Sequence, residues 1–319
     1  MRIQHLCLLV TFFSASISCH SRYAIDKDLK AVDAVLTYEA TIKAVPANAS
    51  TVRAWIPLPS ASAFQVVGDL HVQPADATVV QDPIYGNRLL YLERHSPNNE
   101  PLKVTATYEL VRREQIAHPE DNDDELMQRY LQPDRLGIID KRVREMAAKA
   151  VEGKTGTMTR ARAIYDYVLE HMEYNKVTPG WGRGDTARAC DVGKGNCSDY
   201  HSLFISLARA AGIPARFHYG LSLKPNGVAG PHCWAAFYDK KNGWVPVDIS
   251  EADKAPEKTE YFFGHLSENR IQLTTGRDIT LTPPQEGAPL NFLINPYVEV
   301  DGQTHDEVIY KASYRSTTQ

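Results

Sequence analysis

The sequence predicts an α+β protein in which an N-terminal antiparallel β-sandwich precedes a core that contains helices. Three observations predict this. Short runs of alternating hydrophobic residues fill positions 32–114, hydrophobic residues recur at helical spacing after position 138, and two strand-like runs follow a glycine-rich segment. The 319 residues have room for two domains, and 43% hydrophobic with 23% charged residues is typical of a globular protein.

The first residues are predicted to form a secretory signal rather than part of the fold. Arg2 supplies a positive charge, residues 6–13 are apolar, and small residues follow. Cys19 then follows Ser-Ile-Ser, which is similar to a bacterial lipoprotein cleavage box with Ser16 in place of the usual aliphatic residue. We therefore expect residues 1–19 to be a signal peptide that directs export to the periplasm or cell envelope. Lipid attachment at Cys19 and ordinary cleavage nearby both stay open.

The charge balance gives no indication of a nucleic-acid-binding surface. The chain has 35 basic and 39 acidic residues, and its formal net charge is −4. After the signal, no stretch reaches the ~18 uninterrupted apolar residues that a membrane-spanning helix needs. We therefore expect no nucleic-acid partner and no membrane contact beyond a lipid anchor, and the oligomeric state is not indicated.

Residues 20–116 are predicted to form the β-sandwich. Strand-like segments separated by turn residues occur at 32–45, 51–59, 64–73, 77–84, 88–94 and 101–114. No cluster of titratable residues occurs in this part, so we interpret it as a packing or binding module. Residues 117–137 follow as an acidic, exposed linker, because HPEDNDDE does not have the ligand spacing of an EF-hand loop.

Residues 138–319 are predicted to form the second domain, which ends in a C-terminal β extension. Hydrophobic residues at helical spacing predict helices over 138–151 and 159–172. The segment 179–196 is polar and glycine-rich and is expected to be a long loop. Its Arg-Gly-Asp tripeptide is interpreted as loop sequence, and its Gly-Lys-Gly lacks the spacing of a phosphate-binding loop.

Cys197 lies where the glycine-rich segment is expected to become a helix. Residues 198–211 carry a hydrophobic stripe that ends at Gly212 and Pro214, and cap-forming residues such as Asn196 precede it. A helix N-terminus stabilises a thiolate and lowers the pKa of a cysteine below its usual ~8.5. Taken alone, a cysteine is more often a small buried residue, so a catalytic role requires a base and a group that orients the base.

Two histidines are candidates for the base. His201 follows Cys197 by one helical turn, but side chains on a helix lean toward its N-terminus, which is poor geometry for proton exchange. We expect His201 to be packed or hydrogen-bonded beneath the site. His232 begins the strand-like run 232–238, which Asp-Lys-Lys-Asn-Gly joins to a second run at 243–250 in a hairpin.

The length of the hairpin loop decides whether His232 and Asp248 share a face of the sheet. A five-residue loop pairs Tyr238 with Trp244 and makes His232 and Asp248 diagonal neighbours on one face. A two-residue Asn-Gly loop sends them to opposite faces. A catalytic pair therefore requires the longer loop.

The blocks GNCSDYHSLFISLARAAGIPAR, HCWAAFY and GWVPVDIS resemble the transglutaminase-like superfamily, which shares its core with papain-type cysteine peptidases. The resemblance covers roughly residues 138–250. Two further segments within 269–302 resemble the tail of bacterial members, and the N-terminal module is weakly similar to β domains attached to such cores. The resemblance implies a papain-like core in which the helix that carries the cysteine packs on an antiparallel sheet.

The resemblance also implies that Cys197, His232 and Asp248 form a catalytic triad that acts on an amide bond through an acyl-thioester. It implies a peptide or protein substrate, water or an amine as the acceptor, and neither a metal nor another cofactor. Trp181 and Trp234 are expected to wall the acyl site, although Trp234 fits the core equally well. The alternative is a catalytically silent surface module that uses this core for binding.

Three cysteines remain once the signal and Cys19 are set aside, namely Cys190, Cys197 and Cys233. In an oxidising compartment the simplest arrangement is one disulfide and one free thiol. If Cys197 is the reactive thiol, Cys190 and Cys233 are the expected disulfide. The alternative that all three are reduced stays open, because spacing alone does not exclude it.

Overall fold

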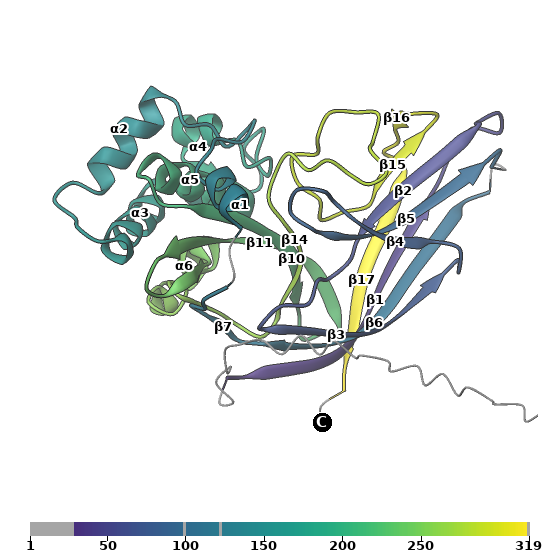
Figure 1. Cartoon of the computed structure of the whole chain (residues 1–319), viewed down its shortest axis with the longest axis horizontal. Coiled ribbons are helices and arrows are strands. Elements are labelled where there is room, and N and C mark those ends of the chain that lie inside the picture. Colours follow the sequence, from purple (N-terminus) through teal and green to yellow (C-terminus); the bar gives the residue numbers. More distant parts are fainter. Residues whose placement is uncertain (1–28, 98–99, 121–122, 318–319) are drawn as a thin grey trace, which may run out of the picture.

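The computed structural model describes residues 29–97, 100–120 and 123–317. Its helices gather at one end of the molecule, while most strands extend toward the other end (Figure 1). The predicted signal peptide, including Cys19, lies outside the described residues. No helix in the described part is long and apolar enough to cross a membrane. The combination of helices with mostly antiparallel sheets confirms the predicted α+β fold class.

The largest sheet joins strands from both halves of the chain. It runs in the order β14-β10-β11-β17-β1-β6-β3, and β12 pairs with β11 beside this path. Its strands are β1 (Ala31–Ile42), β3 (Gln65–Gln73), β6 (Leu102–Arg113), β10 (Ala215–Leu223), β11 (Val228–Asp239), β12 (Gly243–Val247), β14 (Arg270–Thr275) and β17 (Val308–Ser316).

A smaller sheet, in the order β16-β15-β2-β5-β4, completes the sandwich. Its strands are β2 (Thr51–Pro57), β4 (Thr78–Gln81), β5 (Arg88–His95), β15 (Tyr297–Val300) and β16 (Gln303–Thr304). Alternate residues of β1, such as Leu36 and Tyr38, are buried with Leu90 and Leu92 of β5 in the core of the sandwich.

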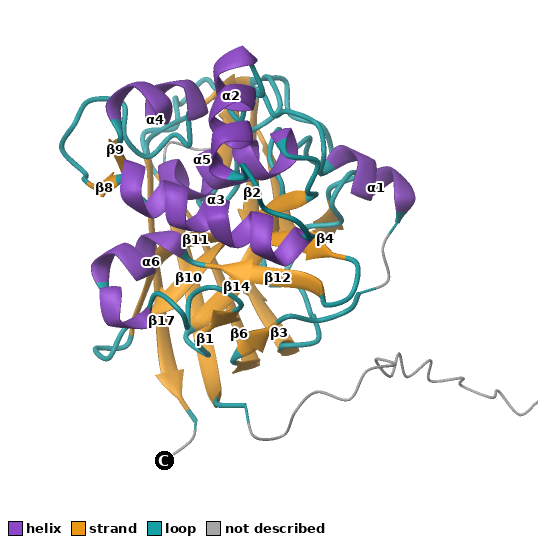
Figure 2. Ribbon diagram, turned by 90° about the vertical axis from the view of Figure 1, so that its left-hand side faces the viewer, coloured by secondary structure: helices purple, strands orange, loops and turns teal. Residues whose placement is uncertain are grey.

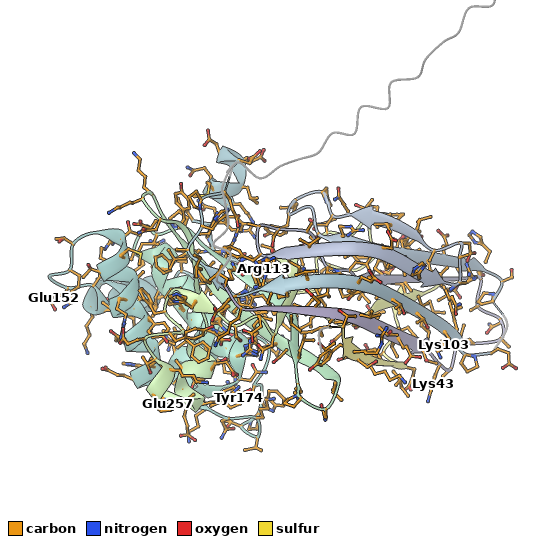
Figure 3. All side chains as sticks on the ribbon, turned by 90° about the horizontal axis from the view of Figure 1, so that it is seen from below. Lys43, Lys103, Arg113, Glu152, Tyr174 and Glu257 are labelled. Atoms are coloured by element: carbon orange, nitrogen blue, oxygen red, sulfur yellow. The ribbon has the colours of Figure 1, made fainter. Side chains whose placement is uncertain are left out.

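The C-terminal strands belong to this sandwich, although the sequence does not reveal their partners. Strand β15 pairs with β2, and β17 pairs with β1 along its whole length. Lys43 and Lys103 lie at the far end of the sandwich and Glu152 at the helical end (Figure 3). The division into domains at 20–116 and 138–319 stays a prediction, because one sheet runs through both parts.

The described part of the chain has six α-helices, of which α2–α6 gather over one face of strands β10 and β11, whereas α1 packs with Ala236 and Trp244 on the opposite face (Figure 2). They are α1 (Asp124–Arg129), α2 (Lys141–Ala150), α3 (Thr157–His171), α4 (Thr186–Val192), α5 (Cys197–Ala210) and α6 (Ile249–Lys254). The remaining short elements are β7 (Gln115–Ile116) with β13 (His265–Leu266), β8 (Glu173–Tyr174) with β9 (Lys194–Gly195), and a 3-10 turn at Pro256–Lys258. Helix α5 is central and is buried from Ser198 to Arg209.

Two segments that the sequence predicts to be irregular are partly ordered. The expected loop 179–196 contains the helix α4. Asp185 of the Arg-Gly-Asp tripeptide is the N-cap of this helix, and its side chain stabilises the helix start. The expected linker 117–137 contains α1 and is anchored rather than fully exposed. Tyr130, in this segment, is buried and packs edge-on against the Trp244 ring at 5.3 Å.

The β11–β12 hairpin has the register that a shared face for His232 and Asp248 requires. Tyr238 pairs with Trp244, which confirms the predicted register, and Asp239 also pairs with Gly243, so the turn itself consists of residues 240–242.

Strand β11 changes its partner along one edge. Residues 235–239 pair with β12, and Val228 and Ala229 pair with β17, whereas β10 follows the opposite edge throughout. Within the described residues, positions 230–234 therefore have no strand on the first edge. Pro231 contributes to this interruption because it has no backbone N–H to donate.

The substitution Gly243→Ala is expected to destabilise the fold strongly. Gly243 has a φ of +77°, and a Cβ atom there would lie 2.2 Å from the backbone oxygen of His118. Because this backbone cannot move aside at low cost, we expect a loss of about 2–5 kcal/mol in the free energy of unfolding, measured by urea denaturation.

The matched control is Gly153→Ala. Gly153 has a similar φ of +67°, but a Cβ atom there would meet nothing within 4 Å. Only the backbone strain remains, so the expected loss is about 1 kcal/mol. Equal losses in the two variants would contradict the assigned clash.

Candidate active site

Cys197 is the first residue of α5, one position before the predicted helix 198–211. The Asn196 side chain caps this helix by accepting a hydrogen bond from the Ser198 N–H at 3.0 Å, and Asp199 completes a capping box. The helix macrodipole therefore places partial positive charge beside the Cys197 sulfur. Cys197 is partly exposed, so this end of the buried helix borders solvent.

The Asp199 carboxylate fastens the loop before α4 to the same helix end. The residue is fully buried, and its carboxylate accepts hydrogen bonds from the backbone N–H groups of Gly182 at 2.8 Å, Gly184 at 3.0 Å and Asn196 at 2.9 Å. A Cβ atom on Gly195 would lie 2.2 Å from Asp199 Oδ2, so this close approach requires glycine.

His232 and Asp248 form a direct hydrogen bond in the interior. His232 Nε2 lies 2.7 Å from Asp248 Oδ2, and both residues are buried. Because Nε2 is engaged with the carboxylate, Nδ1 is the ring nitrogen left for Cys197, whose side chain hydrogen-bonds with His232. The three residues that the sequence places far apart are therefore brought into one chain of contacts.

Asp248 is held by several further groups. It is the N-cap of α6, and its Oδ1 accepts hydrogen bonds from the Ser250 hydroxyl at 3.1 Å and the Glu251 N–H at 3.2 Å. Arg270 Nε lies 3.5 Å from Oδ2. Since Asp248 begins a helix, the second strand ends at Val247 rather than running through residues 243–250 as predicted.

These contacts shift the pKa values of the buried pair. Burial disfavours the charged ring of His232, but the charge of Asp248 and the hydrogen bond to it outweigh burial and raise the pKa of His232 to about 9. Burial acts against the ionised Asp248 as well, yet His232 and Arg270 hold its pKa below the usual value. At neutral pH the ring is therefore protonated and the carboxylate ionised.

The pKa of the Cys197 thiol lies well below its usual value. Cys233 hydrogen-bonds to the sulfur, and the hydrogen bond and charge of His232 add to this effect, which together outweigh burial. Burial and the neighbouring Cys197 raise the pKa of Cys233 well above its usual value, so Cys233 keeps its proton and acts as the donor. The lowered pKa of Cys197 beside the protonated ring of His232 therefore favours a thiolate–imidazolium pair.

The predicted disulfide between Cys190 and Cys233 is not formed, because both residues carry free thiols. Cys190 lies on α4 and packs against the helical core. Cys233 is adjacent to His232 on β11 and is directed to Cys197, and its Sγ lies 3.9 Å from His201 Nδ1. The disulfide was predicted only because Cys197 was set aside as the reactive thiol. The prediction is wrong because Cys233, on β11, lies in the candidate site beside Cys197 and not beside Cys190.

The prediction that His201 is packed and hydrogen-bonded beneath the site is confirmed. His201 is fully buried, and its Nε2 accepts a hydrogen bond from the Ile249 N–H at 3.0 Å. Burial lowers the pKa of His201, so the ring is neutral. The ring therefore supports the start of α6 beside Asp248.

The two tryptophans occupy different environments. Trp234 is fully buried on β11, with its ring centroid 6.3 Å from that of His232, so it is a core residue and not a wall of an open site. Alternate residues of the strand share a face, which places Trp234 beside His232 within the sheet packing. Trp181 is 38% exposed in the loop that Asp199 fastens to α5.

The roles of three residues, Asp199, Arg270 and Cys233, are not evident in the sequence. The capping-box spacing of Asn196 and Asp199 indicates a helix start, but not the attachment of a distant loop. Arg270 is buried and also contacts Glu251 at 3.1 Å, and no local pattern distinguishes it from other arginines. Cys233 is noticed only as a disulfide candidate.

The arrangement is suited to nucleophilic chemistry. A partly exposed thiolate beside a protonated imidazole can attack an electrophilic carbon, and the imidazole can then give its proton to the leaving group. Within the described residues, no group of three or more His, Cys, Asp or Glu is placed to hold a metal ion.

Known proteins resemble this chain in sequence and in fold. Residues 144–249, which include Cys197, His232 and Asp248, match the model of the transglutaminase-like superfamily. A protein of Haemophilus influenzae, described only as uncharacterized, is 30% identical over 296 residues, which cover 78% of this chain and 80% of the relative.

Two crystal structures match this chain, the first of them with a similar fold. A protein of Cytophaga hutchinsonii proposed to be a cysteine protease has a TM-score of 0.62 and 16% identity, covering 91% of this chain and 92% of that chain. The periplasmic domain of TgpA from Pseudomonas aeruginosa, bound to ethylmercury, has a TM-score of 0.41 and 17% identity, covering 73% of this chain and 94% of that chain. From the family match and the Haemophilus relative, together with this core, the chain belongs to the transglutaminase-like superfamily.

Proposed function

We propose that this protein is an exported cysteine-dependent enzyme that cleaves or transfers amide bonds of peptides or proteins through an acyl-thioester. The observation that carries the proposal is the 2.7 Å hydrogen bond between His232 and Asp248 beside a Cys197 thiol of lowered pKa. Export, and the lipid anchor at Cys19, rest on the sequence of residues 1–19 alone.

In the first step the Cys197 thiolate attacks the carbonyl carbon of the amide. A sulfur–carbon bond forms, and the electrons of the C=O bond move to the oxygen. The backbone N–H of Cys197 has no acceptor within the described residues and lies in the first turn of α5, so it is available to this oxyanion. We assign Trp181 as a wall of the acyl site, since it is exposed beside this helix end.

In the second step the carbon–nitrogen bond breaks and His232 gives its proton to the departing amine. The ionised Asp248 keeps the ring oriented and stabilises its charged form before transfer. The acyl group is now a thioester on Cys197. Water, or an amine acceptor, then attacks the thioester and loses its proton to the neutral His232, which restores the thiolate–imidazolium pair.

Hydrolysis is the favoured outcome of the second half-reaction. Cys197 borders solvent, and Trp181 is also exposed, so water has access to the thioester. Transfer to an amine is the second outcome, and it requires the acceptor to exclude water. The alternative is a catalytically silent binding module. The lowered pKa of the Cys197 thiol argues against it, because binding alone does not require an ionised thiol.

Cys197 is expected to react with iodoacetamide faster than an ordinary cysteine at about pH 7, because the lowered pKa of its thiol leaves more of the thiol ionised. Cys190 serves as an internal control: burial raises the pKa of its thiol, so it should react slowly at the same pH. The rates are measured by mass spectrometry of the two cysteine peptides.

The variant His232→Ala tests the source of this reactivity. It removes a hydrogen bond and a positive charge from Cys197, so the thiol pKa should rise and labelling at about pH 7 should fall by about tenfold or more. If Cys197 and Cys190 react equally slowly in the unaltered protein, the binding-module alternative is favoured.

The variant Cys197→Ala is expected to lower kcat/KM by about 10⁴-fold or more, because the nucleophile is lost. Glutamine-containing peptides are incubated with and without added amine, and the products are weighed. Chain fragments indicate peptidase activity, glutamate indicates amidase activity, and an amine adduct indicates acyl transfer. Cys190→Ala is the matched control and should keep its activity, and turnover by Cys197→Ala would refute the assigned nucleophile.

The alkaline limb of the pH profile of kcat/KM is expected near pH 9, where His232 loses the proton that the leaving amine needs. The pKa of His232 is raised, so its proton is fully present at lower pH and is lost as the pH rises through about 9. Asp248→Asn removes the charge that raises this pKa, and the limb should therefore move to lower pH.

The control for this shift is Glu257→Gln, which also removes one negative charge but from the exposed surface at the helical end (Figure 3). Its profile should match that of the unaltered enzyme. An alkaline limb that stays in place in Asp248→Asn would disprove the role of Asp248 in setting the pKa of His232.

A further inference from the structure

Strands β11 and β17 separate close to the candidate active site. They pair only through Val228–Ser313 and Ala229–Ala312. From there β17 continues along β1 toward Val308, while β11 continues toward His232. The two strands lie side by side at the base of this fork, where the sandwich meets the helical end (Figure 1).

A cavity of about 320 Å³ lies in this fork, and we refer to it as the fork pocket. Residues of β11 and β17 form two of its walls, with contributions from β1, β10, the turn after β10 and the segment before β15. Its lining residues are Tyr38, Leu221, Lys224, Val228–Pro231, Ile294, Asn295 and Tyr310–Ala312.

The fork pocket lies on the face of β11 from which Cys233 projects. Side chains alternate along a strand, so Ala229, Pro231 and Cys233 project from one face. Ala229 and Pro231 line the pocket, and Cys233 hydrogen-bonds with Cys197. Pro231 at the pocket directly precedes His232, so a peptide that leaves the pocket along β11 passes His232 and Cys233.

Lys224 gives the fork pocket a positive charge that nothing in the described chain neutralises. Its Nζ lies 3.3 Å from the position that a Cβ atom on Gly230 would take, so the ammonium group rests over the strand just before His232. No ion pair or hydrogen bond of this Nζ occurs within the described residues. Lys311, by contrast, is already paired with Glu39 at 2.7 Å.

The fork pocket also contains the polar side chain of Asn295. Its Oδ1 is buried and has no hydrogen-bond partner among the described residues, so it can accept from a ligand N–H group once the side chain turns toward the pocket. The rings of Tyr38 and Tyr310 stack with centroids 6.2 Å apart, and Tyr310 and Val228 at the rim are 37% and 44% exposed. An acceptor, an unpaired cation and an aromatic wall suit a peptide segment that carries a carboxylate.

We propose that the fork pocket is a substrate subsite that binds a carboxylate-bearing residue of a peptide, next to the amide that Cys197 attacks. Lys224 pairs with the carboxylate, and Asn295 accepts from a backbone N–H of the same residue. The carboxylate is either an acidic side chain or the end of a peptide chain. The subsite rests on the proposed function, because it names the substrate class for that reaction.

The test measures peptide binding to the Cys197→Ala variant, which needs no turnover. Three peptides of equal length are compared by calorimetry. One carries glutamate with an amidated end, the second carries glutamine with a free terminal carboxylate, and the third carries glutamine with an amidated end. We expect one of the first two to bind about tenfold more tightly than the third, and its identity gives the source of the carboxylate.

Lys224 is tested in the same background. Lys224→Gln should abolish the preference for the carboxylate peptide, and Lys224→Arg should retain most of it because the charge is kept. Lys240→Gln is the matched control, since Lys240 is an exposed lysine near the other end of the β11–β12 hairpin. Equal binding of all three peptides, no measurable binding of any, or equal effects of Lys224→Gln and Lys240→Gln would overturn the subsite.

The subsite and the proposed function can fail separately. If Cys197 labels rapidly and the enzyme turns over peptides without any carboxylate preference, only the subsite is wrong. If Cys197 is unreactive and turnover is absent while the Lys224-dependent preference persists, the enzyme assignment is wrong and the pocket is a binding site of the silent module.

Discussion

The change of partner along one edge of β11 is the constraint on which the site depends. Over residues 230–234 neither β12 nor β17 pairs with this edge, and the N-terminus of α5 meets His232 and Cys233 there. A regular ladder would place another strand in this position and would separate the thiol from the imidazole. The interruption instead leaves room for a helix end on one side and for the fork pocket where β17 diverges.

Buried charge in this interval is compensated by groups from several elements. Isolated, the Asp248 carboxylate would be costly to bury, but His232 from β11, Arg270 from β14 and the first turn of α6 all interact with it. The protonated ring in turn favours the Cys197 thiolate. Negative and positive groups thus alternate from the Cys197 sulfur through His232 and Asp248 to the Arg270 guanidinium. Each charged group lowers the free-energy cost of burying the next one.

Parts of the site that depend on local sequence were predictable. The Asn196 to Asp199 spacing marks the start of α5, and the Tyr238–Trp244 register follows once the five-residue loop is required. The prediction of a disulfide between Cys190 and Cys233 was wrong. The number of cysteines does not show which face of β11 packs against α5. Trp234 was ambiguous for the same reason, since burial is decided by the layer packed over its face.

The sequence by itself determined the N-terminal strands of the sandwich, the helix that Cys197 begins and the hairpin that carries His232 and Asp248, because alternation, capping and turn residues act over a few positions. Only the tertiary structure decided that β17 pairs with both β1 and β11, that Cys233 reaches Cys197 and that Arg270 reaches Asp248. These contacts join residues far apart in the chain. They follow from how sheets and helices bury their apolar faces together, which no local pattern encodes.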